Sequence, residues 1–317
     1  MSLTAVSVKS AVQRSWNEPV LKGILIVNAF LNTPQVNETY EALMAGAKRA
    51  GIDMTLSTNA DYLVDPGSNL VINQRSDCDP TDVDFILFWN KDVFLGRALE
   101  RIGCRLYNPA DAIEFCDNKA LTFERLEGIC PVPRTFRIPM TFNTIGFTSL
   151  DFESDIGELL GYPYVIKESL GSYGGQVYLA DSPGKAKEIL RSIEGKDCIA
   201  QEYIKESSGH DIRAYVVGDR VVAAMERYNA NDFRSNIANG GSATACIVTD
   251  EQERIAVSAV KKLGLDFAGV DLLIAKGGRP LLCEVNSNAQ FKGLKDATGI
   301  DITDALFEHI IRNGDGS

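Results

Sequence analysis

The chain has little histidine and no paired cysteines. Its two histidines, His210 and His309, are too few for a zinc site or a serine–histidine triad. Its seven cysteines are scattered, odd in number and without a C-x-x-C pair, which is typical of a reducing, cytoplasmic setting rather than a disulfide framework. We expect most of them to be core thiols. They are Cys78, Cys104, Cys116, Cys130, Cys198, Cys246 and Cys283.

Long apolar runs, an excess of basic residues and low-complexity tracts are also missing. No run reaches the roughly 18 residues of a membrane span. Residues 1–21 lack the apolar core of a signal peptide, and Ser2-Leu3 resembles a cloning remnant. A net charge of −11 argues against an extended nucleic-acid interface, which needs a basic face. We therefore expect a cytoplasmic, globular protein of roughly two or three domains, without membrane or nucleic-acid partners. The sequence leaves open whether the protein forms a homo-oligomer.

Residues 22–116 have the pattern of a small α/β domain. The apolar runs Lys22–Phe30 and Asp84–Asn90 predict buried strands, and helical spacing follows each of them, over Asn37–Ala50 and Val93–Ile102. This alternation predicts an open, Rossmann-like α/β sheet. No G-x-G-x-x-G follows the first strand, which argues against a dinucleotide site there.

The second part of the chain, residues 117–313, reads as an α+β region in which hairpins and helices alternate. Two short β runs flank the glycine-rich turn "GSYGG", and Lys167 lies on the first of them. Hairpins are predicted to turn at Gly218-Asp219 and through Lys276–Arg279. The arrangement of strands and helices therefore differs from that of the first domain.

The last hairpin carries an unusual pair of acids. In "LLCEVN", Glu284 and Asn286 share one face of a strand, because successive side chains alternate. If Ala275 faces Pro280, Asp271 lies directly opposite Glu284. Like charges in that position are destabilising.

The arrangement makes sense if a divalent cation lies between the two carboxylates, with the Asn286 oxygen as a further ligand. Ligands that are all oxygen favour magnesium, which also binds nucleotide phosphates. The alternative is an ordinary salt-bridged pair, satisfied by Lys276 or Arg279.

Two glycine-rich segments are candidates for phosphate binding. In "KESLGSYGGQV", Lys167 supplies a cation, and glycine amides can approach phosphates closely. The segment is not a P-loop, and by itself a flexible hairpin turn is an equal interpretation. "FRSN", Phe233–Asn236, is a second such loop and alone would be a solvated loop.

Taken in order, these segments resemble the ATP-grasp fold, and specifically the RimK-type α-L-glutamate ligase family. The resemblance covers Gly161–Arg312, and the first hundred residues match only in type, as a pre-ATP-grasp domain. It implies an ATP-grasp domain over 117–313, with a lid over about 131–198 and a nucleotide and metal subdomain over about 199–313. The matching segments are "YVIKESLGSYGGQVYLA", "AQEYIKESSGHDIRAYVVGDRVVAAMER", "DFRSNIANGGSA", "FAGVDLLIAKGGRPLLCEVNS" and "GLKDATGIDIT".

The resemblance also implies roles for single residues. Lys119 and Lys167 correspond to the lysines that contact ATP phosphates, and Asp211 matches the acidic position near the ribose. Arg227 and Arg234 would stabilise an acyl-phosphate and its transition state. The implied flap is Gly171, Ser172, Tyr173, Gly174 and Gly175. The adenine segment is Gln201, Glu202, Tyr203 and Ile204. Arg213, Arg234, Ser235 and Asn236 complete the nucleotide set, although Arg213 could equally be a structural ion-pair partner. The metal ligands, for Mg²⁺ or Mn²⁺, are Asp271, Glu284 and Asn286.

The implied activity is ATP-dependent joining of a carboxylate to an amine through an acyl-phosphate, with glutamate or another amino acid added to a protein, peptide or small metabolite. ATP binding without ligation and a small-molecule kinase on the same fold remain as alternatives. One segment departs from the family. "NSNAQFKGL" places Asn288, Ala289 and Gln290 where Ser-Pro-Gly is usual, and Lys292 where an acid is common. This leaves the substrates open.

Overall fold

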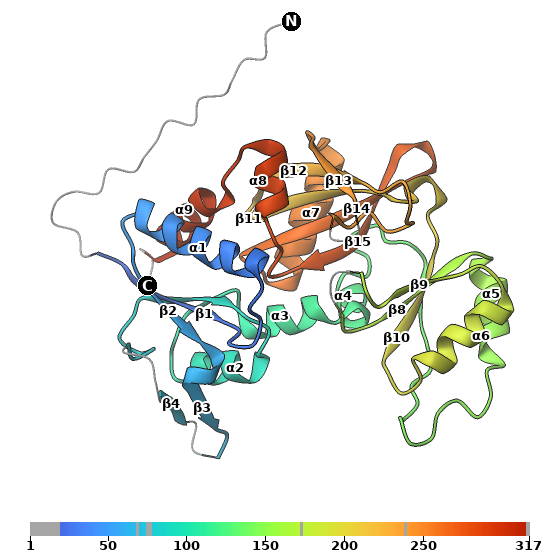
Figure 1. The fold of residues 1–317 in the computed structure, drawn as a ribbon, viewed down its shortest axis with the longest axis horizontal. Helices are drawn as coiled ribbons and strands as arrows, with labels where there is room; N and C mark the ends of the chain where they lie inside the picture. Colours follow the sequence, from blue (N-terminus) through green and yellow to red (C-terminus); the bar gives the residue numbers. More distant parts are fainter. Residues whose placement is uncertain (1–19, 68–69, 74–77, 172–173, 238–239, 315–317) are drawn as a thin grey trace, which may run out of the picture.

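The computed structural model describes residues 20–67, 70–73, 78–171, 174–237 and 240–314. These residues build three larger sheets and one small hairpin. In Figure 1 the first sheet lies at lower left, the third sheet runs across the top, and the second sheet lies at right. None of the helices in the described ranges is long and apolar enough to cross a bilayer.

The first sheet is parallel, with the order β2-β1-β5-β6. Its central strands β1 and β5 are buried almost throughout, as expected for parallel strands covered on both faces. This confirms the predicted α/β sheet. The hairpin of β3 and β4 was not predicted. The strands are β1 (Lys22–Val27), β2 (Asp53–Thr58), β3 (Tyr62–Asp65), β4 (Leu70–Asn73), β5 (Phe85–Trp89) and β6 (Leu106–Tyr107), and the helices are α1 (Pro34–Arg49) and α2 (Val93–Arg101).

The second sheet has the order β7-β10-β8-β9 and is antiparallel. Strand β10 pairs with both β7 and β8, so it belongs to this sheet. The lid boundary near residue 198 stays a prediction. The elements of this region are β7 (Thr135–Arg137), α5 (Phe152–Leu160), β8 (Tyr164–Glu168), β9 (Val177–Ala180), α6 (Pro183–Ser192) and β10 (Cys198–Glu202).

The third sheet has the order β13-β12-β11-β14-β15. Helix α7 packs against it and is firmly delimited, by a capping box of Thr249 and Gln252 at its start and by Gly264 in the left-handed region at its end. The elements are β11 (His210–Val217), β12 (Arg220–Tyr228), β13 (Ser242–Ala245), α7 (Asp250–Leu263), β14 (Phe267–Ala275) and β15 (Arg279–Asn286).

Further helices and short 3₁₀ turns lie between and around the strands of the described ranges. Asn118 separates α3 from α4, as the C-cap of the first and the N-cap of the second. The elements are α3 (Ala110–Asp117), α4 (Lys119–Arg125), α8 (Lys292–Thr298), α9 (Ile302–Gly314), η1 (Asn59–Asp61), η2 (Lys205–Ser207) and η4 (Lys276–Gly278).

The β14–β15 register differs from the prediction at the turn. Ala275 pairs with Arg279 and Ile274 with Pro280, one position away from the expected alignment of Ala275 with Pro280. A β-bulge next to Asp271 then shifts the register by one residue, so that Asp271 does pair with Glu284. The predicted acid pair is confirmed, although the alignment assumed for it was wrong at the turn.

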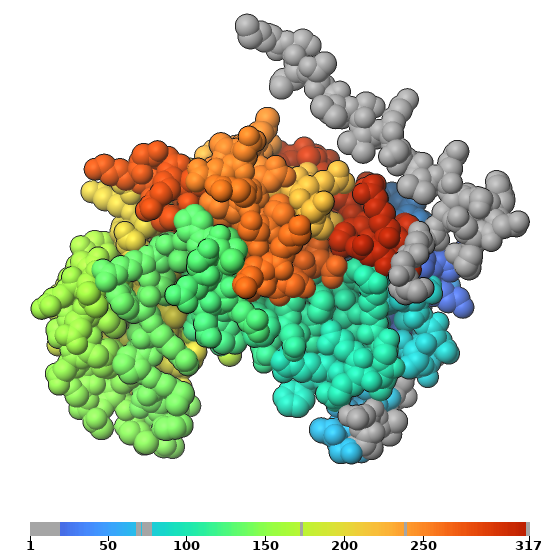
Figure 2. All heavy atoms as spheres, turned by 180° about the vertical axis from the view of Figure 1, so that it is seen from behind, coloured from blue at the N-terminus to red at the C-terminus, as the bar shows by residue number. Residues whose placement is uncertain are grey.

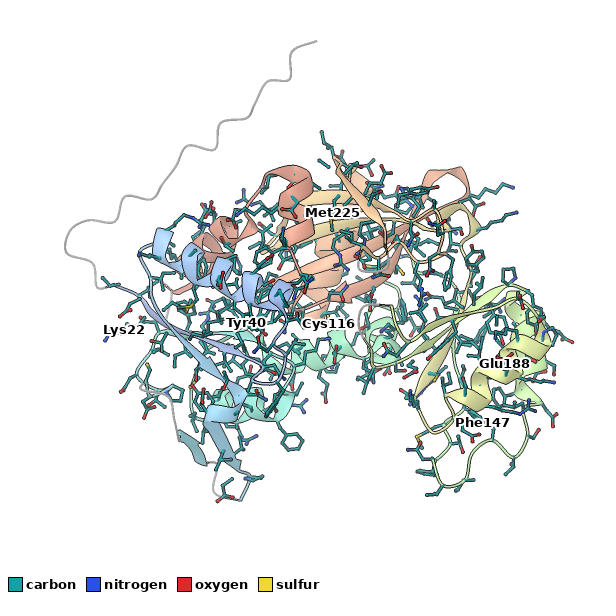
Figure 3. The ribbon with its side chains drawn as sticks, viewed as in Figure 1. Lys22, Tyr40, Cys116, Phe147, Glu188 and Met225 are labelled. Atoms are coloured by element: carbon teal, nitrogen blue, oxygen red, sulfur yellow. The ribbon has the colours of Figure 1, made fainter. Side chains whose placement is uncertain are left out.

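Apolar packing joins the first sheet to the third. One core contains Tyr40 on α1, Met225 on β12 and Phe307 on α9, and the first two are marked in Figure 3. The second sheet has its own core with α5 and α6. Seen from behind in Figure 2, an open notch separates the second-sheet unit from the first, while the third sheet bridges them. All seven cysteines are free. Three of them, Cys116, Cys130 and Cys198, are buried and the other four are partly buried, so fewer are core thiols than the majority we expected.

Candidate active site

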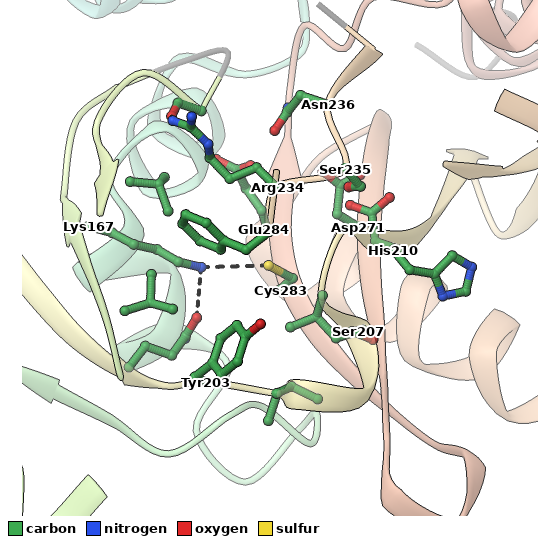
Figure 4. Close-up of a pocket in the computed structure, with 18 of the residues that line it drawn as sticks. Lys167, Tyr203, Ser207, His210, Arg234, Ser235, Asn236, Asp271, Cys283 and Glu284 are labelled. Atoms are coloured by element: carbon green, nitrogen blue, oxygen red, sulfur yellow. Dashed lines mark hydrogen bonds between the residues drawn. The ribbon is translucent and has the colours of Figure 1, made fainter. Parts of the chain in front are cut away.

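A cleft of about 840 Å³ lies between the second and third sheets. Its walls come from β8, β9 and β10 on one side and from β11, β12, β14 and β15 on the other, as Figure 4 shows in part. The lining residues are Lys119, Val165, Lys167, Gly171, Gly174, Gln176, Val177, Gln201, Glu202, Tyr203, Ile204, Ser207, His210, Asp211, Arg227, Phe233, Arg234, Ser235, Asn236, Asp271, Leu273, Cys283 and Glu284.

Lys119 is positioned by the start of helix α4. The Asn118 side chain accepts hydrogen bonds from the backbone of Ala120 and Leu121, which caps the helix and fixes its first residue. The Lys119 backbone N–H donates to the Ser169 carbonyl just after β8. The Lys119 Nζ then lies 3.3 Å from Glu284 Oε1 and donates to the Gly171 carbonyl.

Lys167 projects from β8 into the centre of the cleft (Figure 4). Its Nζ donates to Gln201 Oε1 at 2.7 Å and lies 3.6 Å from Cys283 Sγ. The side chain is buried, yet its closest oxygen is a neutral amide. A buried ammonium without a carboxylate partner is costly, and an anionic ligand would relieve that cost.

One end of the cleft is apolar. Val165 precedes Lys167 by two positions on β8, and Leu273 follows Asp271 by two on β14, so both share the face of a predicted site residue. The rings of Tyr203 and Phe233 meet edge to face at 6.4 Å. Together these side chains form a compartment suited to a flat aromatic group.

A buried ion-pair network closes the opposite wall. Arg213 on β11 donates twice to Asp271, at 2.7 Å from Nε and 2.7 Å from Nη2. Arg227 on β12 contacts Asp271 at 2.9 Å and also pairs with Asp211 through two nitrogens. Burial raises the pKa of Asp271, but the two guanidinium groups outweigh it and hold that pKa below its usual value. Burial lowers the pKa of Arg227, and the two carboxylates outweigh it in the other direction.

The carboxylates of the predicted metal site are therefore paired, but not with the partners considered from sequence. Arg213 and Arg227 bind Asp271, and Lys119 binds Glu284; neither Lys276 nor Arg279 forms these pairs. Within the described ranges, no three acidic, histidine or cysteine side chains gather into a metal cluster.

The donor set still fits a divalent cation. Asp271 and Glu284 face each other across two strands, and Asn286 follows on the face of Glu284. The buried Asn286 Nδ2 has no hydrogen-bond partner among the described residues, and the same amide carries an oxygen that can serve as an ion ligand. The third oxygen would have to come from Asn286. The metal assignment itself stays a prediction.

Arg234 links the glycine-rich turn to the loop after β12. Its Nη1 donates to the Gly174 carbonyl at 2.6 Å, and the guanidinium is held by Asp232. Hydrogen bonds from Arg234 lower the pKa of Asp232. In Figure 4 Arg234, Ser235 and Asn236 lie along one edge of the cleft.

Most of the predicted site residues come together in this cleft. Arg213 pairs with Asp271 but does not line the cleft. Gly175 and Asn286 are not among the lining residues either. Ser172 and Tyr173 fall outside the described residues. Asp211 lines the cleft, but its carboxylate is engaged by Arg227, so the ribose contact stays a prediction.

Several lining residues were missed by sequence reasoning. The alternation with Lys167 and Asp271 could have identified Val165 and Leu273. Cys283 carried no such signal, because only the β-bulge turns it to the same side as Glu284. His210 points away from the other side chains in Figure 4 and contacts Glu226 at 2.8 Å. The remaining missed residues are Gln176, Val177, Ser207 and Phe233.

Comparison with known proteins gives related sequences over most of the chain. The family model of the RimK-like ATP-grasp domain matches residues 137–310. A probable alpha-L-glutamate ligase 2 of Shewanella denitrificans is 38% identical over 224 residues, which are 68% of this chain and 70% of that protein. N-acetylaspartylglutamate synthase A of Homo sapiens is 36% identical over 215 residues, 67% of this chain and 54% of that protein. The chain thus spans only about half the length of the human protein.

A solved structure extends the likeness to the whole fold. The ATP-grasp ligase PsnB, complexed with a phosphomimetic variant of a minimal precursor, Mg and ADP, superposes with a TM-score of 0.66. The match covers 92% of this chain and 98% of that one. At 16% sequence identity this likeness concerns the fold alone.

Proposed function

The chain belongs to the RimK-like ATP-grasp family and is an ATP-dependent ligase that forms carbon–nitrogen bonds, and from this premise we propose that its cleft activates a carboxylate with ATP and transfers the acyl group to an amine. The observation that carries this proposal is the convergence of Lys119, Lys167 and the Asp271–Glu284 pair beside an apolar compartment. The adenine ring of ATP would fit that compartment, and the phosphates of the nucleotide would extend toward the charged groups.

The charge balance of the cleft supports binding of ATP together with a metal. Four lysine and arginine side chains line it, and so do four carboxylates, Glu202, Asp211, Asp271 and Glu284. A triphosphate alone would meet a wall with no net positive charge. A divalent cation at Asp271, Glu284 and Asn286, Mg²⁺ or Mn²⁺, would neutralise both the acids and the phosphate oxygens.

The chemistry then proceeds in two displacements. A carboxylate oxygen of the first substrate attacks the γ-phosphorus, the bond from that phosphorus to the β–γ bridging oxygen breaks, and ADP and an acyl-phosphate form. The amine attacks the acyl carbon, loses a proton and expels inorganic phosphate, which leaves an amide. No side-chain nucleophile is required, in agreement with the raised pKa of Cys283, which burial keeps as a thiol.

Positively charged groups would stabilise the transferring phosphoryl group. Lys119 and Lys167 suit the phosphates as point charges, while Arg227 and Arg234 present planar guanidinium groups. Arg234 also holds the Gly174 carbonyl, so it would close the glycine-rich turn over the phosphates and exclude water from an acyl-phosphate that hydrolyses readily.

One substrate is an amino acid, and we propose that it is glutamate. The support is the glutamate in the names of both relatives, the bacterial alpha-L-glutamate ligase and the human N-acetylaspartylglutamate synthase. The other substrate, a protein, a peptide or a small carboxylate, is set by contacts outside the nucleotide cleft.

Product analysis tests this proposal. Purified protein with ATP, Mg²⁺ and L-glutamate is screened against small carboxylates and acidic peptides for phosphate release, followed by mass spectrometry of the product. We expect ADP, phosphate and an amide in equal amounts. A stable phosphorylated product would establish a kinase instead, and tight ATP binding without turnover in any pair would establish a binding protein.

A further inference from the structure

A chain of hydrogen bonds leads from the Lys167 ammonium out of the cleft and across the second sheet. The ammonium donates to Gln201 Oε1 at 2.7 Å, and Gln201 Nε2 donates to Thr135 Oγ1 at 2.9 Å. Thr135 Oγ1 in turn donates to the Pro133 carbonyl at 2.8 Å. Lys167 and Gln201 line the cleft, whereas Thr135 does not. The chain therefore connects a cation of the cleft to a residue outside the cleft lining.

Strand pairing brings the three side chains to one face of the sheet. Thr135 on β7 lies directly opposite Gln201 on β10, and Gln201 lies opposite Val165 on β8. Opposite residues share a face, and Lys167 follows Val165 by two positions, so Lys167 shares that face as well. Lys167 is thus a diagonal neighbour of Gln201, at a separation that two long side chains can span.

The polarity of these hydrogen bonds fixes the Gln201 amide from both ends. The Pro133 carbonyl can only accept, so it takes the Thr135 hydroxyl proton and leaves Oγ1 to accept from Gln201. The Lys167 ammonium can only donate, so it requires the amide oxygen. Both demands turn the NH₂ toward Thr135 and the oxygen toward Lys167. A rotated amide would direct its NH₂ at the ammonium.

Burial makes the direction of this amide important. Gln201 is 2% exposed and Lys167 7%, so a polar atom that loses its partner there is left unsatisfied. Gln201 Oε1 is the one hydrogen-bonded oxygen of the Lys167 ammonium among the described residues, and Cys283 Sγ, at 3.6 Å, is only a weak acceptor. Figure 4 marks both contacts with dashed lines. The place of the ammonium thus depends on an amide whose direction depends on Thr135.

From these contacts we propose that Thr135 is a positioning residue for Lys167, which acts through Gln201 and does not touch the nucleotide. It holds the ammonium where the proposed function places the phosphates of ATP, and the inference rests on that function. The three hydrogen bonds include no side chain of the apolar compartment. Loss of the Thr135 hydroxyl should therefore affect the binding of phosphates and not the binding of the base.

Nucleotide titrations of the full chain test this role. Thr135→Val keeps the shape of the side chain and removes its hydroxyl, and Thr135→Ser restores the hydroxyl. Thr141→Val is the matched control, because the Thr141 hydroxyl also donates to a backbone carbonyl, that of Gly146, and Thr141 does not line the cleft. Calorimetry measures the binding of ATP with Mg²⁺. An NMR titration measures the binding of adenosine, which has no phosphates.

We expect Thr135→Val to weaken ATP binding about fivefold or more, as the loss of one hydrogen bond does, and to leave adenosine binding within twofold. Thr135→Ser and Thr141→Val should bind both ligands like the wild type. Should Thr135→Val not fold, Thr135→Ala carries the same expectation.

Two results would overturn the positioning role alone. One is equal ATP affinity in Thr135→Val and the wild type. The other is an equal loss of affinity for ATP and adenosine, because that pattern indicates general damage to the cleft. A wild type that binds no ATP would instead reject the proposed function, and the inference with it.

Discussion

At the scale of single residues, the four cations of the cleft differ in how tightly the protein already holds them. Arg227 and Arg234 are fixed by carboxylates, each through a guanidinium that contacts its partner at two or more nitrogens. Lys167 contacts a neutral amide, and Lys119 reaches Glu284 only at 3.3 Å. The lysines are therefore the groups with most to gain from an arriving phosphate.

Lys167→Ala should weaken ATP binding by well over tenfold. The substitution removes a buried ammonium whose one hydrogen-bonded oxygen among the described residues is Gln201 Oε1, so a phosphate loses its charge partner at the centre of the cleft. Equilibrium titration with ATP measures the effect. Lys196→Ala, which removes an exposed lysine paired with Glu168, is the control and should bind ATP normally. Unaltered affinity in Lys167→Ala would count against the phosphate role.

Glu284→Gln should abolish Mg²⁺-dependent turnover, by at least about a hundredfold, and leave the fold intact. The amide keeps the shape of the side chain and a hydrogen-bond acceptor for Lys119, but the charge opposite Asp271 is lost. Phosphate release over a Mg²⁺ titration and circular dichroism give the two readouts. The exposed Glu206→Gln serves as control. Normal ADP release by Glu284→Gln would refute the metal site.

Sequence reasoning reached the individual site residues but not their partners. Lys167, Asp271 and Glu284 stand out by type, spacing and family resemblance. The pairing of Arg213 with Asp271 and of Arg227 with Asp211 depends on the alignment of β11 with its two neighbours. No local pattern specifies that alignment, because strand pairing is fixed by the packing of the whole sheet.

At the scale of elements, a helix cap and a β-bulge orient the charged side chains of the cleft. Helix α4 begins at Lys119 because the Asn118 side chain caps it, and α3 ends at the same point. The β-bulge at the start of the Asp271–Glu284 pair turns Cys283 and Glu284 toward the cleft together. The helix cap and the β-bulge thus set the side-chain orientation of residues whose type alone could be read from the sequence.

Asn118→Ala should cost about 0.5–2 kcal/mol of unfolding free energy and raise the KM for ATP several-fold. Loss of the cap frays the first turn of α4, which carries Lys119. The matched control is Thr249→Ala, which removes the cap of α7 at a distance from the cleft residues. Urea unfolding and ATP kinetics are compared for both. Equal stability losses with a raised KM in Asn118→Ala alone support the positioning role, and an equal KM in both would contradict it.

The positions of strands and helices could be predicted from apolar periodicity. The β-bulge in the β14–β15 pair and the break between α3 and α4 were not predicted. The prediction placed the β14–β15 turn one position out and still found the acid pair, because an unforeseen bulge compensated. Asn118, where α3 ends and α4 begins, did carry a signal, because Asn favours helix caps over helix interiors.

At the scale of the whole molecule, the first and third sheets form one body and the second sheet another. The shared core is reinforced at the surface, where Arg49 at the end of α1 contacts Asp301 and Asp304 before and within α9. Burial raises the pKa of Asp301, but hydrogen bonds from Lys295 and Thr303 outweigh it, so the pKa is lowered.

Asp301→Asn should lower the stability of this body by about 1 kcal/mol at neutral pH. A carboxylate with a depressed pKa stabilises the fold above its unfolded value of about 3.9, and this contribution is lost as the pH falls through the lower folded pKa. The stability difference between wild type and variant should therefore be constant near neutrality and vanish in strong acid. Urea unfolding at pH 7, 5 and 3 measures it. A difference that persists unchanged at the lowest pH would contradict the ion-pair account.

The order of domains was predictable from sequence, but the junction between them was not. Resemblance covered the ATP-grasp half, and alternation of strands and helices gave the first sheet. The contact of Asn288 with Asn90 joins residues almost two hundred positions apart. Such a contact arises from the docking of two folded units and leaves no periodic signal in either.

The most direct measurement of the central claim follows oxygen through the reaction. The carboxylate substrate found in the screen is labelled with ¹⁸O in its carboxyl group and incubated with enzyme, ATP, Mg²⁺ and L-glutamate. If the cleft activates a carboxylate as an acyl-phosphate, each released inorganic phosphate carries one ¹⁸O atom derived from that carboxyl group. Release of unlabelled phosphate alongside the amide product would contradict the account.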